Sequence, residues 1–326
     1  MDSAGIIAWT RVSVLILAFG LAAWMDHRER RVPNEFWITW AKPAAFLWTL
    51  DLMIQSAEWY HYSTAAAMIA YASIAVIGRP TIHDILAGKS MDIIVSLWYI
   101  FGLAGIIQGA MHHGSEGPME VIVGSASADA TLWWTIMAVA IPIFLVDMAW
   151  RMRLIHGGAD CKALMWVSIM IPSWDAVPVV WPGSLEAATI AMPPAIALLV
   201  WGGFAFLVLP FIMVIKNLKD GGGPLKLIWH AEKMPLSEVA TNHVWLLTTI
   251  AEMPDGTKKI IHRTRAPSKS PSKDKLAQSI AILEENSVDT VWVTRKFPLL
   301  VFLWPAVLPL VLIGGPMALL MPMLGL

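Results

Sequence analysis

Eight long apolar stretches constrain the fold of this chain more than any other feature. A helix needs about 20 mostly apolar residues to cross a lipid bilayer, and each stretch approaches that length. The chain is 57% hydrophobic and 14% charged, which is too apolar for a water-soluble protein of 326 residues. The sequence therefore predicts an all-α polytopic membrane bundle. The predicted spans cover, roughly, residues 5–25, 36–55, 62–78, 91–110, 131–149, 161–182, 187–215 and 297–325.

Lysine and arginine are distributed unevenly between the predicted loops. Of the 23 basic residues, 21 lie in four segments, and the loops that alternate with these segments hold none. Cytoplasmic loops carry the excess of Lys and Arg, so the four segments are predicted to be cytoplasmic and both chain ends to be outside. The basic segments are 26–35, 79–92, 149–162 and 216–296. Arg11 and Lys42 fall inside predicted spans, where snorkelling toward the headgroups is the favoured interpretation and a functional role is the alternative.

The charge pattern also predicts the domain organisation. Residues 1–215 are expected to form a membrane domain that holds both candidate motifs described below. Residues 216–296 are the polar segment long enough to fold separately, as a small α+β cytoplasmic domain inserted before the last helix. Residues 297–326 then form the last transmembrane helix.

Three local patterns define the cytoplasmic domain. Residues 244–250 and 258–263 flank Pro254-Asp255-Gly256, which indicates a β-hairpin. Residues 273–285 place apolar side chains at helical spacing, which indicates an amphipathic helix. Residues 291–293 are predicted to be a last strand that leads into the final span.

Two aspartates are the best candidates for chemistry. Asp26 ends the first predicted span and Asp160 opens the sixth, and the predicted topology puts both at the cytoplasmic face. Two facing carboxyl groups that share one proton can activate a water molecule and protonate a leaving amine. Each aspartate alone could instead be a helix cap or part of a surface ion pair. Asp147 is the strongest alternative carboxylate, and Asp84 and Asp92 are weaker ones.

The residues around both aspartates resemble the motifs of type IV prepilin peptidases, which are GxGD membrane aspartyl proteases. Residues 26–34, DHRERRVPN, resemble the D-x-R-x-R-x-I-P-N stretch of that family. The matching positions are Asp26, Arg28, Arg30, Val32, Pro33 and Asn34. Residues 157–164, GGADCKAL, resemble its GxGD motif with the following lysine. The positions concerned are Gly157, Gly158, Ala159, Asp160 and Lys162. Archaeal preflagellin (prearchaellin) peptidases fit best, because they carry a cytoplasmic domain before the last span.

The chain departs from the family pattern in three respects. Ala159 replaces the second glycine of GxGD. Asp26 and Asp160 are 134 residues apart, which is more than usual, and residues around 56–130 are predicted to form an inserted helix pair. The cysteine pairs of the bacterial bifunctional enzymes are missing, since Cys161 is the only cysteine, so N-methylation of the product is not expected.

The resemblance implies an aspartic endopeptidase that removes short basic leader peptides from preflagellin or type IV pilin-like precursors. Its active site would lie at the cytoplasmic face of the cell membrane, with Asp26 and Asp160 as the catalytic pair. Those precursors and membrane lipid are the expected partners, and no nucleic acid is expected at a net charge of −1. No cofactor is expected. A polytopic ion-coupled transporter and an inactive scaffold of an assembly machine are the alternatives.

The residues next to the two aspartates are expected to have simpler roles. Gly157 and Gly158 would let the backbone bend or approach a neighbour, or would form a plain turn. Lys162 would balance charge or mark the inner side. No metal role is expected for His27 or His156, which adjoin the motifs. His112 and His113 are expected to be solvated outside.

Overall fold

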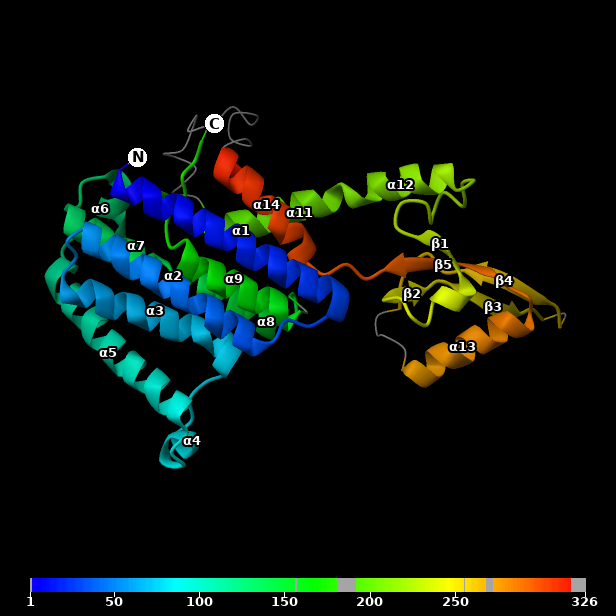
Figure 1. The fold of residues 1–326 in the computed structure, drawn as a ribbon, viewed down its shortest axis with the longest axis horizontal. Coiled ribbons are helices and arrows are strands. Elements are labelled where there is room, and N and C mark those ends of the chain that lie inside the picture. Colours follow the sequence, from blue (N-terminus) through cyan, green and yellow to red (C-terminus); the bar gives the residue numbers. More distant parts are fainter. Residues whose placement is uncertain (1, 156, 181–191, 255, 268–271, 318–326) are drawn as a thin grey trace. The chain divides into compact units, whose positions relative to one another are not determined.

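The computed structural model describes residues 2–155, 157–180, 192–254, 256–267 and 272–317 (Figure 1). Most of these residues are helical. The chain divides into two compact units, and the boundary between them falls within a helix. We call Met1–Gly203 together with Pro298–Leu326 the helical unit, and Phe204–Phe297 the sheet unit.

Four helical stretches in the described part of the chain are long and apolar enough to cross a membrane. They are Ser3–Glu29, Ser90–His113, Ala128–Arg151 and Pro194–Lys219. These stretches indicate a membrane protein. Eight spans are not confirmed, because the other predicted spans lie in shorter or less apolar helices, and residues 181–191 and 318–326 lie outside the described part.

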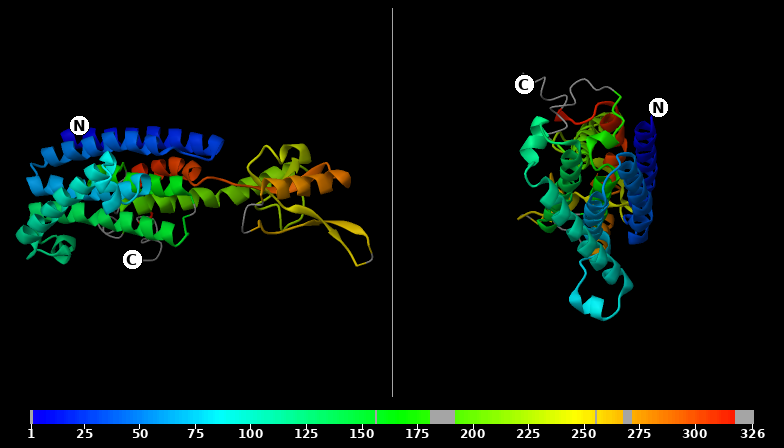
Figure 2. Two further views of the ribbon diagram at one scale, coloured as in Figure 1. Left: turned by 90° about the horizontal axis from the view of Figure 1, so that it is seen from below. Right: turned by 90° about the vertical axis from the view of Figure 1, so that its left-hand side faces the viewer.

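The long helices of the helical unit run roughly alongside one another (Figure 2). The helices of this unit are α1 (Ser3–Glu29), α2 (Asn34–Ile54), α3 (Trp59–Ile77), α4 (Ile82–Leu86), α5 (Ser90–His113), α6 (Pro118–Val123), α7 (Ala128–Ala138), α8 (Ala140–Arg151), α9 (Gly158–Met170), α11 (Pro194–Leu207) and α14 (Leu300–Leu312). Residues 163–170 of α9 are all buried, and this helix packs against α1, α2, α3, α8 and α14. A helix that is apolar on all sides belongs in the interior, which explains the central position of α9.

The sixth predicted span is shorter than its apolar stretch. Helix α9 ends at Met170, two residues before Pro172, and a short 3-10 turn follows at Trp174–Ala176. Proline cannot donate the helical hydrogen bond, and it disfavours helical geometry in the residue before it. The prediction that this segment bends or ends early at its prolines is therefore confirmed.

Arg11 does not snorkel. Its side chain is fully buried and donates hydrogen bonds to the carbonyl oxygens of Met170, at 2.5 Å, and Leu47, at 3.1 Å. It also lies 3.3 Å from a carboxylate oxygen of Asp51. The snorkelling interpretation of Arg11 is wrong because α2 and the end of α9 supply internal partners, including a carbonyl that has no partner within its own helix. The side chain of Lys42 is exposed, as snorkelling requires.

The helix pair predicted around residues 56–130 forms as α3 and α5, which pack closely along their lengths, and its status as an insertion stays a prediction. Two glycines of α5 permit this approach. A Cβ atom at Gly102 would lie 2.4 Å from the Cβ of Ala67, and one at Gly105 would lie 2.5 Å from the Cβ of Ser63. Small residues at such contacts are characteristic of helix packing in membranes.

The sheet unit combines short strands with two helices. Its elements are α12 (Leu209–Lys219), β1 (Glu232–Pro235), β2 (Val244–Leu246), β3 (Thr248–Glu252), β4 (Lys258–His262), α13 (Lys273–Glu285), β5 (Thr290–Arg295) and a 3-10 turn at Leu236–Glu238. Antiparallel pairing gives the strand order β1-β5-β2, and β3 and β4 form a separate hairpin. The carboxylate of Glu232 binds both Lys216 and Arg295, which ties α12 to the sheet.

Local patterns in the sheet unit are largely confirmed. The hairpin, the helix at 273–285 and the strand around 291–293 all form, and Leu276 and Leu283 of α13 pack on the sheet core. The predicted strand 244–250 is interrupted at Leu247. The N–H of Leu247 donates to the carbonyl of Trp292, and its own carbonyl accepts from Arg263, so this residue bonds β5 on one side and the end of the hairpin on the other.

Candidate active site

The helical unit brings the two predicted aspartates together. Asp26 lies in the last turn of α1 and is 7% exposed, and Asp160 lies in the first turn of α9. Their carboxyl groups are close enough for the two charges to interact. Like charges that act on each other disfavour the state in which both groups are ionised. The catalytic pairing of Asp26 and Asp160 stays a prediction.

The end of α1 fixes the backbone at Asp26. The helix stops at Arg30, which adopts the left-handed conformation with φ of 56° and donates its N–H to the carbonyl of Asp26 at 3.1 Å. This arrangement closes the last turn in the way that helix C-caps usually do. The charge of the Arg30 side chain also acts on the Asp26 carboxylate, so one cation of the first motif neighbours the aspartate pair.

Asp160 is oriented by the beginning of the last helix. The backbone N–H of Leu300, the first residue of α14, donates a hydrogen bond to the Asp160 carboxylate. The first N–H groups of a helix have no partner inside the helix and carry the positive end of its dipole, so they hold an anion well. The Oδ1 atom of Asp160 is buried and has no hydrogen-bond partner among the described residues. That buried oxygen is thus an acceptor that a water molecule or a substrate group would satisfy on reaching it.

Gly157 has a steric function that its neighbour Gly158 lacks. A Cβ atom at Gly157 would lie 2.1 Å from Oδ2 of Asp160 and 2.9 Å from its Cγ, whereas one at Gly158 would meet nothing within 4 Å. Only glycine at position 157 leaves the Asp160 carboxylate in its place. At Ala159 the side chain lines a cavity, so the departure from the second glycine of the motif is accommodated.

A hydrogen bond joins the two motifs directly. The ammonium group of Lys162 donates to the side-chain oxygen of Asn34 at 2.6 Å, and the amide of Asn34 donates to the carbonyl of Val76 at 2.9 Å. Asn34 begins α2 and Val76 lies in the last turn of α3. Lys162 therefore connects α9 to α2 and α3, and its hydrogen-bond partner belongs to the other motif rather than being Asp160.

A cavity of about 300 Å³ lies between the two motifs. Three cationic side chains and one carboxylate give it a polar lining. The lining residues are Arg30, Arg31, Val32, Pro33, Asn34, Glu35, Ala159 and Lys162. A space of this size and polarity can admit a segment of peptide chain.

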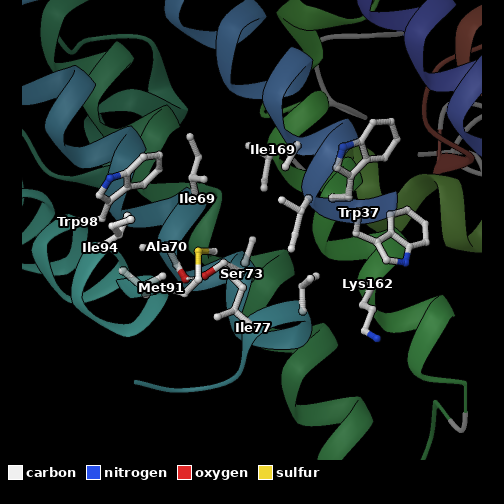
Figure 3. A pocket seen from close by; sticks show the side chains of 16 residues that line it. Trp37, Ile69, Ala70, Ser73, Ile77, Met91, Ile94, Trp98, Lys162 and Ile169 are labelled. Atoms are coloured by element: carbon white, nitrogen blue, oxygen red, sulfur yellow. Dashed lines mark hydrogen bonds between the residues drawn. The ribbon is translucent and has the colours of Figure 1, made fainter. Parts of the chain in front are cut away.

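An apolar pocket begins on the other side of Lys162 (Figure 3). It has a volume of about 210 Å³ and lies between α2, α3, α5 and α9. Trp37 and Ile169 line it near Lys162, and Trp98 and Ile94 line it on the α5 side (Figure 3). Lys162 is the charged residue in this lining, so the pocket suits apolar side chains.

The other aspartates have cationic partners. Asp147 is 5% exposed and lies 2.9 Å from Nε of Arg151 and 3.5 Å from a guanidinium nitrogen of Arg79. Asp84 lies outside the candidate spans, where its hydrogen bond with Lys89 holds the pKa of its carboxyl group below the usual value. Both carboxylates therefore act as partners in ion pairs.

The remaining predicted motif residues lie around the pair. Arg28 is exposed, and its guanidinium lies 5.6 Å from the ring centroid of Trp24, one turn earlier in α1. Pro33 precedes α2 as its N-cap, so the helix begins one residue later, at Asn34. His156 lies outside the described residues.

Sequence reasoning missed a second polar cluster. His61, His113 and Asp129 place ligand atoms within 4.8 Å of one another. The expectation that His113 is solvated is wrong, because it is 6% exposed, whereas His112 is exposed as expected. All three residues lie near helix ends on the predicted outer side, and this shared depth is the one signal in the sequence that pointed to the cluster.

The apolar helices indicate a membrane protein, and two of its carboxyl groups, at the ends of different helices, act on each other electrostatically. No protein-family model matches the chain. A preflagellin peptidase of Methanococcus voltae is 28% identical over 239 residues, which make up 72% of this chain and 90% of that protein. This similarity supports placing the chain in a preflagellin peptidase-like family.

Proposed function

We propose that the chain is a membrane aspartic endopeptidase that removes short basic leader peptides from preflagellin or type IV pilin-like precursors. The observation that carries the proposal is the electrostatic interaction between Asp26 and Asp160, which lie at the ends of helices far apart in sequence. The similarity to a preflagellin peptidase supports the same activity. The predicted topology puts this site at the cytoplasmic face.

The chemistry follows from the sharing of one proton by the two aspartates. The ionised carboxylate removes a proton from a water molecule, whose oxygen forms a bond to the scissile carbonyl carbon. The protonated carboxyl group gives its proton to the leaving amine as the carbon–nitrogen bond breaks. The N–H of Leu300 and the empty space at Gly157 keep the Asp160 carboxylate in position during these steps.

The two cavities suit the two parts of such a precursor. A pilin-like precursor has a short leader followed by a hydrophobic helix, and the cut falls between them. The apolar pocket next to Lys162 would receive side chains from the start of that helix. The polar cavity between the motifs would hold the peptide bond region near the aspartates.

Co-expression with a preflagellin-like precursor tests the proposal. The mature N-terminus, measured by mass spectrometry, should begin after a small residue at the end of the leader. A parallel sample without the chain should retain the full leader. A precursor that is inserted in the membrane and keeps its leader in both samples would contradict the proposed function.

A further inference from the structure

The cluster of His61, His113 and Asp129 joins three helices of the helical unit. His61 lies in the first turn of α3, His113 is the last residue of α5, and Asp129 lies in the first turn of α7. The His61 side chain is fully buried, that of His113 is 8% exposed and that of Asp129 is 47% exposed. The two imidazoles thus lie inside the protein while the carboxylate opens the cluster to solvent.

The distances within the cluster match those between ligands of one metal ion. Nε2 of His113 lies 3.2 Å from Oδ2 of Asp129, and Nε2 of His61 lies 3.5 Å from Oδ1. In a tetrahedral zinc site with bonds of about 2.0–2.1 Å, neighbouring ligand atoms are roughly 3.3 Å apart. Both imidazoles therefore place a ligand nitrogen near the same carboxylate, one at each oxygen, and the ligand atoms of the three residues lie within 4.8 Å of one another.

Hydrogen bonds do not account for the burial of His61. Nε2 of His61 lies 3.3 Å from the carbonyl oxygen of Asp129, and Nδ1 has no hydrogen-bond partner among the described residues. By contrast, the Tyr60 hydroxyl donates to Asp129 at 2.5 Å and lies 3.0 Å from Nε2 of His113. Nε2, the nitrogen that faces Asp129, makes one long hydrogen bond among the described residues, and an ion bound at that atom would replace it with a shorter contact.

The cluster is separate from the aspartate pair. His61 and Val76 are 15 residues apart on α3, which corresponds to about 22 Å along the helix at 1.5 Å per residue. The carbonyl of Val76 accepts a hydrogen bond from Asn34, which is the partner of Lys162 in the candidate active site. The cluster therefore lies toward the other end of α3. An ion there has no part in the proposed cleavage.

We propose that His61, His113 and Asp129 bind a Zn²⁺ ion that holds the ends of α3, α5 and α7 together. Two imidazole nitrogens and a carboxylate oxygen are a common set of zinc ligands. The exposed side of Asp129 leaves the fourth position to water. The carboxylate stays hydrogen-bonded to Tyr60, as metal-bound carboxylates usually are to neighbouring groups.

Zinc binding to the purified full chain tests this site. The protein is stripped with a chelator, freed of any affinity tag, incubated with ZnCl₂ in detergent and passed through gel filtration. Elemental analysis should find one zinc ion per chain. His113→Ala and Asp129→Asn should each lose that ion, and His83→Ala, which removes an exposed histidine of α4, should keep it.

A second measurement separates metal binding from folding. Zinc should raise the midpoint of thermal unfolding of the wild-type protein and of His83→Ala, but not that of Asp129→Asn, because binding to the folded state alone is stabilising. Asp129→Asn suits this test because its partly exposed side chain keeps the same size. Absence of bound zinc in the wild type, or equal zinc content in Asp129→Asn and the wild type, would overturn the proposal.

Discussion

The helical unit contains two kinds of buried or half-buried carboxylate. Asp51 and Asp147 form ion pairs with arginine side chains, whereas Asp26 and Asp160 act on each other electrostatically, with Arg30 near Asp26. A carboxylate with an arginine partner contributes to a stable interior, whereas two facing carboxylates are unfavourable for stability and are typical of sites that use them chemically. The surroundings of a buried aspartate thus indicate its purpose better than its burial does.

The largest effect on stability is expected at the paired carboxylate Asp51. Replacing Arg11 by Met leaves Asp51 and two backbone carbonyls without their buried cation, so the free energy of unfolding should fall by about 3–5 kcal/mol. Denaturant unfolding in detergent measures this loss. Lys42→Met, at an exposed lysine on α2, is the control and should change stability by well under 1 kcal/mol. Equal stability of the Arg11→Met variant and the wild type would show that the ion pair is dispensable.

Gly157→Ala should damage the facing pair without removing a carboxyl group. The new Cβ would displace the Asp160 carboxylate, and a misplacement of roughly 1 Å costs about 100-fold in rate. Gly158→Ala meets nothing within 4 Å and should cleave at nearly the wild-type rate. The measurement compares the cleavage rates of the two variants at equal amounts of folded protein. Similar rates for both would mean that the position of Asp160 does not limit the reaction.

The hydrogen bond between Lys162 and Asn34 should contribute less to the cleavage rate than the two aspartates do. Lys162→Met and Asn34→Ala should each slow cleavage about tenfold, the effect of losing one hydrogen bond to a charged group. Because both changes remove the same contact, the double variant should be no slower than the slower single variant. Multiplied effects in the double variant would show that the two residues act independently.

The smallest expected effect is a change in the pH dependence of stability in the sheet unit, which lies outside the predicted spans. Burial lowers the pKa of His262, whose Nδ1 lies 3.2 Å from the Thr248 hydroxyl. The unfolded chain therefore takes up a proton at a higher pH than the folded chain. The contribution of His262 to the free energy of unfolding is complete above pH 6.5, the ordinary pKa of histidine. It declines as the pH falls toward the lowered pKa of the folded state.

Hydrogen exchange of β3 and β4 measures this decline. Protection of the hairpin amides should decrease between neutral pH and pH values below 6.5 in the wild type, relative to a His262→Gln variant in which no group titrates at this position. The exposed His243 supplies the control variant His243→Gln, which should behave like the wild type. Identical pH dependence in the wild type and in His262→Gln would contradict the assignment to His262.

Patterns that act over a few residues were predictable. The strands β3 and β4 on either side of Pro254 and Gly256, the helix at 273–285 and the end of α9 before Pro172 each depend on nearby residues. The charge pattern put Asp26 and Asp160 at one membrane depth, and their electrostatic interaction agrees with that placement, but the packing of α1 against α9 could not be predicted from it. The eight predicted spans are a different matter, since apolar composition does not fix where a helix starts or ends.

Backbone partners and long-range contacts could not be predicted. The N–H of Leu300 and the carbonyl of Val76 are groups that every residue carries, so no side-chain pattern marks them as partners of Asp160 and Asn34. Arg11 was misinterpreted for the same reason, since its partners include two backbone carbonyls on other helices.

The most direct test of the aspartate pair compares cleavage rates of three matched amide variants in membranes that contain equal amounts of protein. Asp26→Asn and Asp160→Asn should each slow cleavage by about 1,000-fold or more, because an amide neither accepts the proton from water nor supplies one to the amine. Asp147→Asn, at an equally buried carboxylate with arginine partners, should keep most of the activity. Cleavage near the wild-type rate by either Asp26→Asn or Asp160→Asn would contradict a catalytic pair.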